Sequence, residues 1–356
     1  MRELRALLVT PLSGPLARFG RPAATALGLW AAEAADLPPL WGRVRLDVYD
    51  AHPDPAAALR RGLASQPHLV FGPYGSGPAL RALGATERTV WNHGGASSSI
   101  RWPAFPRAVN VLAPASSYFR GTLEAVRAAD PEARRVVILH AAAGFGADVA
   151  RGAVEAAARL HFEATEIGFS PGAAGRAASQ LPDADLLLVA GGFDDELAAA
   201  RASLKREWRA MGFVAAGVDE VLASLGPTRE GLLGPTQWIA TVDAEPDEGP
   251  DVHWFSTRYR SVVGSDPPYP AAQAFGAGVL AARCLRDAGA VDDAAQFAVA
   301  RGLVCRTLYG DFRLDPATGL QVGHEVLTVQ WQEGERRIVW PPKYADRSLV
   351  YPRPMR

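Results

Sequence analysis

The sequence has very few lysines and cysteines and no long apolar run, and each shortage excludes a class of protein. Lys205 and Lys343 are the only lysines among 356 residues, and the net charge is −1, so neither nucleic acid nor an anionic membrane surface is an expected partner. Apolar runs such as residues 135–143 and 185–192 have the length of strands. They fall short of the roughly 18 residues that cross a bilayer, so no direct membrane insertion is expected.

The sequence also lacks the residue patterns of common enzyme and metal sites. It has no His-x-x-x-His or Cys-x-x-Cys pair, no P-loop and no Gly-x-Gly-x-x-Gly turn, so no metal and no nucleotide cofactor is expected. Residues 93–95 (His-Gly-Gly) are typical of the oxyanion loop of esterases, but those enzymes need a Gly-x-Ser-x-Gly elbow. Tyr74 and Pro78 stand where the elbow around Ser76 needs glycines. We therefore predict no catalytic residues and a protein that is not an enzyme.

The N-terminus and the cysteines bear on the compartment of the protein. Met1 leads almost at once into an apolar strand, without the charged segment, apolar core and cleavage site of a signal peptide. We expect a cytoplasmic protein if Met1 is the native start, and a periplasmic or extracytoplasmic one if a signal peptide has been removed. Cys284 and Cys305 allow either one disulfide or two buried free thiols, because spacing alone does not show that the side chains meet.

Apolar strand-like runs alternate with alanine-rich helical runs, which is typical of a parallel α/β sheet. The first half predicts strands at 4–9, 44–49, 69–72, 89–92 and 109–112, with a first helix at 21–35. The second half predicts strands at 135–140, 163–169, 186–190 and 213–216, and helices at 147–160, 173–181, 195–208 and 219–225. Further helices at 252–263, 269–288 and 293–302 precede a hairpin that turns at Glu333-Gly334. Because single cores stop growing at roughly 250 to 300 residues, we expect two domains.

Two glycine-rich loops and one aromatic follow strands of the first half, at the sheet edge where open parallel sheets bind ligands. Phe19 follows the turn at residues 13–15 (Ser-Gly-Pro). Residues 71–78 (Phe-Gly-Pro-Tyr-Gly-Ser-Gly-Pro) precede a helix, so Ser76 is predicted to cap that helix. Its hydroxyl and the free backbone N–H groups of a helix start suit a carboxylate. Tyr74 and Gly75 belong to the same candidate site.

The loop at residues 91–99 (Trp-Asn-His-Gly-Gly-Ala-Ser-Ser-Ser) offers a second set of polar groups. Gly94 and Gly95 let the backbone approach a ligand, and Ser97 supplies a hydroxyl. His93 is either a ligand contact or a satisfied structural histidine.

Single aromatic residues follow several other loops. Phe145 and Phe193 each stand beside a glycine after a strand, and Phe275 lies in a helix. Together with Phe19 they predict a pocket with an apolar wall and a polar anchor, although any one of them alone is expected in the core.

Several motifs occur in a fixed order along nearly the whole chain. They are residues 11–20 (Pro-Leu-Ser-Gly-Pro-Leu-Ala-Arg-Phe-Gly), 48–50 with 54–55, 71–76, 309–316 (Tyr-Gly-Asp-Phe-Arg-Leu-Asp-Pro), 329–331 and 339–342. With them the chain resembles the substrate-binding proteins of branched-chain amino-acid ABC transporters, of the leucine/isoleucine/valine type. The resemblance implies a type I periplasmic binding protein fold, with two doubly wound Rossmann-like α/β lobes joined by three hinge crossings.

The resemblance also implies domain limits and residue roles. Lobe one would comprise residues 1–115 and 244–322, and lobe two residues 116–243 and 323–356, with crossings near 113–116, 239–245 and 322–326. Ser76 and Ser97 would hold a ligand carboxylate, and the Gly94 carbonyl would take an ammonium group. The implied ligand-binding residues are Phe19, Tyr74, Gly75, Ser76, His93, Gly94, Gly95, Ala96, Ser97, Phe145, Phe193, Asp194 and Phe275.

Two departures from such proteins affect the expected ligand. The acid that they use for the ammonium group would fall near residues 215–217, where this chain has none, so Asp194 or Asp195 is the expected substitute. The first-lobe disulfide is also absent, and Gly75 occupies one of its places. We expect a monomeric receptor for an ABC permease that binds a carboxylate, with aliphatic or aromatic amino acids ahead of aromatic acids or amides. A cytoplasmic amide or small-molecule sensor of the same fold is the alternative.

Overall fold

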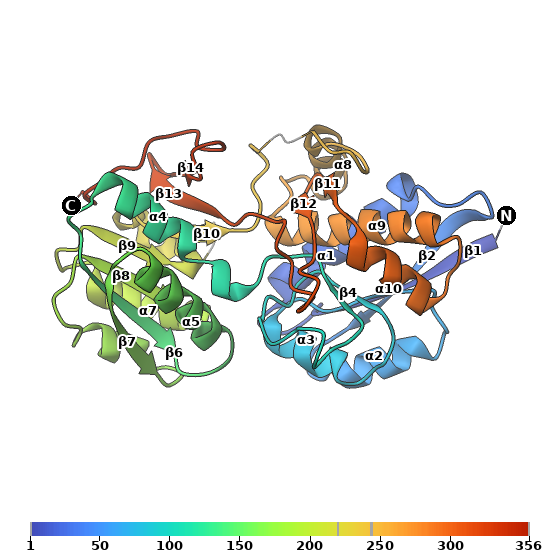
Figure 1. Cartoon of the computed structure of the whole chain (residues 1–356), viewed down its shortest axis with the longest axis horizontal. Coiled ribbons are helices and arrows are strands. Elements are labelled where there is room, and N and C mark those ends of the chain that lie inside the picture. The colour runs from blue at the N-terminus through green and yellow to red at the C-terminus, as the bar shows by residue number, and fades with distance from the viewer. Residues whose placement is uncertain (1, 219–220, 243–244, 355–356) are drawn as a thin grey trace. The chain divides into compact units, whose positions relative to one another are not determined.

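The computed structural model describes residues 2–218, 221–242 and 245–354, and the chain divides into two compact units. Unit 1 comprises Met1–Ala113 and Trp238–Glu325, and unit 2 comprises Pro114–Gln237 and Val326–Arg356. The chain therefore passes between the units three times. Each unit is a sheet with helices packed on it (Figure 1), which confirms the predicted α/β fold class.

Unit 1 is built on a five-stranded parallel sheet in the order β2-β1-β3-β4-β5. The strands are β1 (Arg2–Thr10), β2 (Trp41–Asp50), β3 (Leu69–Phe71), β4 (Val90–Asn92) and β5 (Ala108–Asn110). Alternate side chains of β3 point to opposite faces of the sheet. Val70 packs in a core cluster with Leu59 and Ala79, whereas the Phe71 ring packs against Trp30, with 5.8 Å between the ring centroids. The strands β3, β4 and β5 are buried at every residue, which fits a parallel sheet covered on both faces, whereas the edge strand β2 is half-buried to exposed.

The helices of unit 1 form for local reasons that the sequence carries. They are α1 (Ala17–Leu29), extended by the π-helical turn η1 (Trp30–Ala34), then α2 (Pro55–Leu63), α3 (Ser76–Leu83), α8 (Val252–Val263), α9 (Tyr269–Ala288) and α10 (Asp293–Gly302). The Asp54 carboxylate accepts the N–H groups of Ala56 and Ala57 and caps α2. A short hairpin, β11 (Cys305–Thr307) and β12 (Gly310–Phe312), follows α10.

Unit 2 is built on a seven-stranded mixed sheet in the order β14-β13-β10-β9-β8-β6-β7. Its strands are β6 (Arg135–Ala141), β7 (Glu163–Phe169), β8 (Leu186–Ala190), β9 (Ala210–Phe213), β10 (Leu233–Thr236), β13 (Leu327–Gln332) and β14 (Glu335–Trp340). The antiparallel pair of β13 and β14 confirms the predicted hairpin. Trp331 is core rather than surface, because its ring is 3% exposed and its Nε1–H donates to the Ala216 carbonyl at 3.0 Å.

The helices of unit 2 cover its sheet (Figure 1). They are α4 (Arg120–Ala129), α5 (Gly144–Arg159), α6 (Ala174–Ala178) and α7 (Phe193–Ser203), with 3-10 turns η2 (Ala115–Ser117), η3 (Val214–Gly217) and η4 (Ala223–Arg229). The helix α6 and the helix α7 share one apolar cluster with Leu139 of β6, Val189 of β8 and Met211 of β9. This cluster is the main core on that face.

Several predicted elements differ from the structure in their limits, among them the helix expected at 195–208, which ends at Ser203. The strand expected at 213–216 lies earlier, at 210–213, and 214–217 is a 3-10 turn that packs closely on β10, since a Cβ at Gly217 would be 1.8 Å from the Pro235 carbonyl oxygen. The helix expected at 219–225 begins outside the described residues, and 223–229 is 3-10 structure broken at Gly226, where φ is +53°. The first helix begins at Ala17 rather than at Arg21, which places Phe19 inside its first turn.

Both cysteines are buried free thiols, so the disulfide alternative is not seen in this structure. Burial raises the pKa of Cys305 to about 12 and also raises that of Cys284, which keeps both in the thiol form. Within residues 2–218, 221–242 and 245–354, no helix is long and apolar enough to span a bilayer.

Candidate functional site

Three rings of unit 1, those of Phe19, Tyr74 and Tyr269, form an aromatic cluster. Phe19 is only 4% exposed. Its ring stacks on the Tyr74 ring with 4.7 Å between centroids and 13° between planes, and the Tyr269 centroid lies 6.3 Å away. Phe19 is therefore covered rather than an open wall, and the half-buried tyrosines carry the accessible part of the cluster.

Sequence reasoning missed Tyr269. Its hydroxyl is hydrogen-bonded to the Tyr74 hydroxyl, although the two residues are 195 positions apart in the chain. The only local signal is the pair of prolines at 267–268, which marks the start of α9 at Tyr269. Nothing in the spacing indicates which loop that residue meets.

The loop between β3 and α3 is held by its backbone. Gly75 has a φ of +96°, which favours glycine, and its N–H donates to the Gly94 carbonyl at 2.9 Å. The predicted cap is corrected here: Gly75 occupies the cap position, and Ser76 is the first residue of α3. The Ser76 hydroxyl is half-buried and makes no hydrogen bond with any described residue. It is left available beside the N-terminus of α3.

The loop after β4 is fastened by a buried pair of asparagines. Asn92 donates to the Gly95 carbonyl and to Asn110 Oδ1, both at 2.8 Å, and its own Oδ1 accepts the Gly95 N–H. Asn110, which sequence reasoning did not select, donates to the Ile100 carbonyl at 2.8 Å. Gly94 has no room for a side chain, since a Cβ would lie 2.5 Å from the Tyr74 Cα. The two candidate loops therefore fit together as one backbone surface.

The other predicted ligand-binding residues of this loop, Ser97, Ala96 and His93, differ in their access to a ligand. Ser97 is 8% exposed, and its Oγ accepts the Ser99 N–H at 3.2 Å, which leaves the hydroxyl proton for a ligand. Ala96 is 6% exposed. His93 is fully buried, and burial lowers its pKa to about 4, so it is neutral. Neither ring nitrogen of His93 has a hydrogen-bond partner among the described residues, so His93 is a core residue but not the satisfied structural histidine of the second alternative.

Phe275 is a correction to the predicted ligand set. It is 0% exposed within α9, and its ring packs on Phe255 at 4.8 Å and on Trp254 at 6.0 Å. The helix α9 is buried on nearly all sides beyond its first residue, so Phe275 stabilises unit 1 rather than lining a pocket.

In unit 2, Phe145 and Phe193 each stand at the start of a helix, α5 and α7, after a β-strand. Phe145 is half-buried and meets the Tyr118 ring edge-on at 5.6 Å. The Tyr118 hydroxyl accepts from Gln237 Nε2 at 3.1 Å, and burial raises the pKa of Tyr118 to about 12. Phe193 packs partly against the core of unit 2. Both rings lie at the carboxyl edge of that sheet, where the sequence predicted them.

The acidic residues at the start of α7 have three different environments. Asp194 is exposed and makes no hydrogen bond or ion pair with a described residue. Asp195 Oδ1 accepts the Gly172 N–H at 2.8 Å, so its carboxylate serves a neighbouring turn. Of the two expected substitutes for the missing acid, only Asp194 is left for a ligand.

Glu196 is a buried acid that sequence reasoning missed. It is 0% exposed, and its carboxylate accepts the Gly191 N–H at 3.0 Å and the Ala215 N–H at 2.7 Å. The region near Ala215, which has no acid of its own, therefore receives a carboxylate from α7. Burial raises the pKa of Glu196 to about 8, against the opposing effect of the two N–H donors. The only sequence signal was its place in an acidic first turn.

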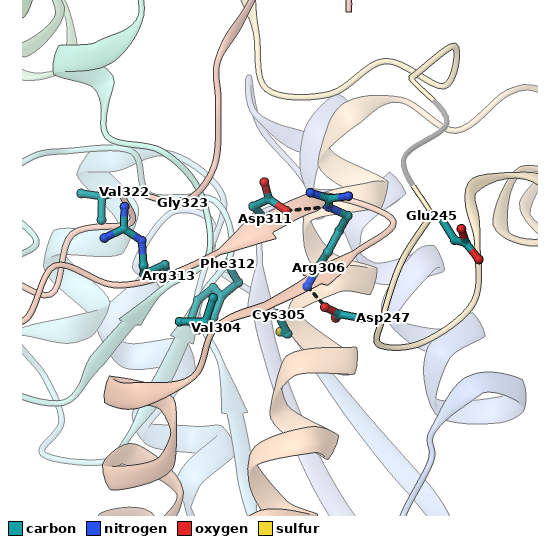
Figure 2. Close-up of a pocket in the computed structure, with 10 residues that line it drawn as sticks. All are labelled: Glu245, Asp247, Val304, Cys305, Arg306, Asp311, Phe312, Arg313, Val322 and Gly323. Carbon is teal, nitrogen blue, oxygen red and sulfur yellow. Dashed lines mark hydrogen bonds and ion pairs between the residues drawn. The ribbon is translucent and has the colours of Figure 1, made fainter. Parts of the chain in front are cut away.

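Unit 1 also contains a cavity of about 590 Å³ between the β11–β12 hairpin and the segment at 245–247 (Figure 2). Its charged groups satisfy one another in large part. Arg306 Nε pairs with Asp311 Oδ1 at 2.6 Å, and the Arg306 backbone N–H donates to Asp247 Oδ1 at 2.7 Å. None of the predicted ligand-binding residues lines this cavity, so it is separate from the candidate site. Among the residues described, no cluster of His, Cys, Asp and Glu could hold a metal ion.

Solved structures with the same fold include receptors for two kinds of carboxylate. A leucine-binding protein from Thermotoga maritima is 17% identical, with a TM-score of 0.79 over 94% of this chain and 97% of that one. An ABC transporter solute-binding protein from R. palustris, in complex with benzoate, is 17% identical, with a TM-score of 0.75 over 95% and 96% of the two chains. A branched-chain amino-acid transporter substrate-binding protein from Streptococcus pneumoniae, in complex with isoleucine, is 14% identical, with a TM-score of 0.77 over 99% and 100%.

The sequence itself identifies the family. Residues 3–336 match the family described as "Periplasmic binding protein". That match spans most of both units, and the fold, with three chain passages between two α/β units, is the one that the resemblance implied. The chain is a member of the periplasmic binding protein family, with the type I fold.

Proposed function

We propose that this protein is a solute-binding receptor for a small carboxylate with an apolar, preferably aromatic, body, and that it binds this ligand without chemistry. The observation that carries the proposal is the backbone surface of unit 1, where the Gly75 N–H to Gly94 carbonyl bond joins two loops beside an unused serine hydroxyl. Amino acids remain the first class of ligand, and aromatic acids the second.

The carboxylate anchor is proposed at the start of α3. Ser76 and Gly77 open this helix, and the first N–H groups of a helix have no partner within it. The Ser76 hydroxyl adds a donor, and the Ser97 hydroxyl adds another from the neighbouring loop. A carboxylate that accepts from such donors gains from both the hydrogen bonds and the positive end of the helix.

The apolar body is proposed to contact the aromatic cluster. Tyr74 and Tyr269 are half-buried, their hydroxyls are hydrogen-bonded to each other, and the Tyr74 ring stacks on Phe19. Rigid tyrosines give a large contact area with little loss of side-chain freedom. Phe145 and Phe193 are the proposed contacts from unit 2.

We propose that Asp194 distinguishes the two ligand classes by pairing with the ammonium group of an amino acid. An α-amino acid carries an ammonium group that needs a carboxylate, and Asp194 is exposed at the start of α7, whereas both oxygens of Glu196 accept backbone N–H groups. An aromatic acid needs no such partner. The aromatic cluster suits the ring of an aromatic acid as well as that of an aromatic amino acid, which supports aromatic acids as the second class.

We expect thermal unfolding in the presence of leucine, phenylalanine, benzoate or 4-hydroxybenzoate to show a higher midpoint with at least one of them, because a ligand that binds only the folded state stabilises it. The variant Ser76→Ala/Ser97→Ala should lose this increase, with Ser99→Ala, an exposed serine of the same loop, as the matched control. Full affinity in the double variant would refute the proposed anchor.

The ligand class is decided by a second variant. If phenylalanine binds through Asp194, Asp194→Asn should weaken its binding about tenfold or more, since one lost charge-assisted contact costs on the order of 1.5–3 kcal/mol. Binding of benzoate should stay unchanged or improve in the same variant. Calorimetric titration of both ligands measures the two effects, and equal loss for both would contradict the assignment of Asp194 to an ammonium group.

The proposed receptor function also implies a protein partner. Ligand binding that shifts an equilibrium between open and closed forms would present the closed form to an ABC permease. The alternative is a sensor of the same fold in the cytoplasm. Fractionation of the native cells separates them, because recovery from the cytoplasm alone would exclude the transport receptor.

A further inference from the structure

A pocket of about 260 Å³ in unit 2 is lined by three cationic side chains and one carboxylate. Arg201 lies in the last turn of α7 and Lys205 in the turn just after it, Arg353 comes from the C-terminal segment, and Glu230 is the carboxylate. None of these residues belongs to the predicted ligand set. The pocket therefore has an excess of positive charge that the proposed receptor function does not use.

Arg353 is an unusually placed cation. It is 9% exposed, and its side chain lies over Gly231, where a Cβ would be 2.9 Å from the Arg353 Cγ. One guanidinium nitrogen donates to the Thr228 carbonyl at 3.2 Å, but the buried Nε has no hydrogen-bond partner among the described residues. A buried cation without a counter-charge is costly, so it points to an anion that completes the site.

The one carboxylate of the lining does not neutralise this cation. Glu230 Oε2 accepts the Glu333 N–H at 2.9 Å, and Oε1 accepts the Gly334 N–H at 2.7 Å, so both oxygens hold the β13–β14 turn. Burial lowers the pKa of Arg353, and no acidic group acts against that shift. Arg353 thus lacks an ionic partner in the part of unit 2 that the structure describes.

Two further cations face the same space. Arg201, in the last turn of α7, donates to the Ser224 hydroxyl at 3.3 Å, and Lys205 makes no hydrogen bond or ion pair with a described residue. Cations in a last helical turn also favour the helix dipole, which accounts for Arg201 by itself. The dipole does not account for a buried Arg353 beside them.

We propose that the pocket formed by Arg201, Lys205 and Arg353 binds an oxyanion of the phosphate class, either free phosphate or the phosphate group of a small molecule. Guanidinium groups match the tetrahedral oxygens of phosphate, and Lys205 adds a mobile ammonium donor. The site lies within unit 2 and is independent of the carboxylate anchor at Ser76.

The test is thermal unfolding of the full chain in 10 mM inorganic phosphate against sodium chloride of equal ionic strength. The unfolding midpoint should rise by about 3 °C in phosphate. Arg201→Ala and Lys205→Ala should each reduce the phosphate affinity at least tenfold in a calorimetric titration. Arg353→Met should fold, since it removes an unpaired buried charge, and should lose the response entirely.

Arg159→Ala is the matched control, because Arg159 is an exposed arginine in the last turn of α5 as Arg201 is in α7. It should respond to phosphate like the wild type. An equal response in all variants, or no response in the wild type, would overturn the proposal. Ser76→Ala/Ser97→Ala should keep the phosphate response, which separates this site from the carboxylate anchor.

The same titration with glycerol phosphate distinguishes the two sources of the anion. Tighter binding of the ester than of phosphate supports a phosphorylated small molecule, and tighter binding of phosphate supports the free ion. Binding of neither would count against the site.

Discussion

Replacing Gly94 by alanine is expected to lower the free energy of unfolding by about 2–3 kcal/mol and to abolish ligand binding. The new Cβ would lie 2.5 Å from the Tyr74 Cα and 3.1 Å from the Pro73 carbonyl oxygen. Backbone atoms cannot move aside as a flexible side chain does, so the loops at 73–76 and 93–97 must separate. That separation breaks the hydrogen bond from the Gly75 N–H to the Gly94 carbonyl.

Gly28→Ala provides the matched control for Gly94→Ala. Gly28 lies inside α1, and a Cβ there would meet nothing within 4 Å. Alanine should therefore raise the free energy of unfolding by about 0.5–1 kcal/mol, because glycine is the poorer helix former. Chemical denaturation and ligand titration of both variants measure the effects. Wild-type affinity in Gly94→Ala would show that the two loops need not touch.

Glu196→Gln is expected to change how stability depends on pH. Burial raises the pKa of Glu196 from 4.5 to about 8 in the folded protein. A raised carboxyl pKa stabilises the fold fully below the unfolded value, and this contribution is lost as pH rises toward the folded value. Between pH 5 and 8 the wild type should lose up to about 1.4 kcal/mol per pH unit relative to the Gln variant.

The measurement is denaturant unfolding of both proteins at several pH values across this range. Asp194→Asn removes an exposed carboxylate from the same helical turn and should leave the pH dependence as in the wild type. A constant difference between Glu196→Gln and the wild type from pH 5 to 8 would mean that Glu196 is ionised throughout. The two N–H groups would then outweigh burial.

Glu196 also has a consequence for the ligand site of unit 2. Its carboxyl group joins the β8–α7 loop at Gly191 to Ala215 in the turn η3 that follows β9, so it fixes two connections of one sheet edge. Phe193 and Asp194 follow the first of these loops directly, as the first two residues of α7. We expect Glu196→Ala to weaken ligand binding by loosening these residues, without any direct contact between Glu196 and the ligand.

Much of the fold could be predicted because it depends on local pattern. The helices at 252–263, 269–288 and 293–302 have the predicted limits, and the alternation of Leu327, Val329 and Trp331 predicted β13. Capping residues and a strand period of two are properties of neighbours in the chain. The strand expected at 213–216 ends at Phe213, and the 3-10 turn after it packs against Pro235 of β10, a contact with a distant residue that the local pattern does not contain.

The sequence by itself determined the fold class, the family and the loops that carry the candidate site, because glycines, serines and strand ends are arranged in sequence order. Only the tertiary structure decided which side chains are accessible. It covered Phe19 with Tyr74 and Tyr269, buried His93 and Phe275, and brought Glu196 to Ala215. Burial and pairing depend on contacts between residues distant in the chain, such as Tyr74 and Tyr269. A local sequence pattern does not indicate which distant residues come into contact.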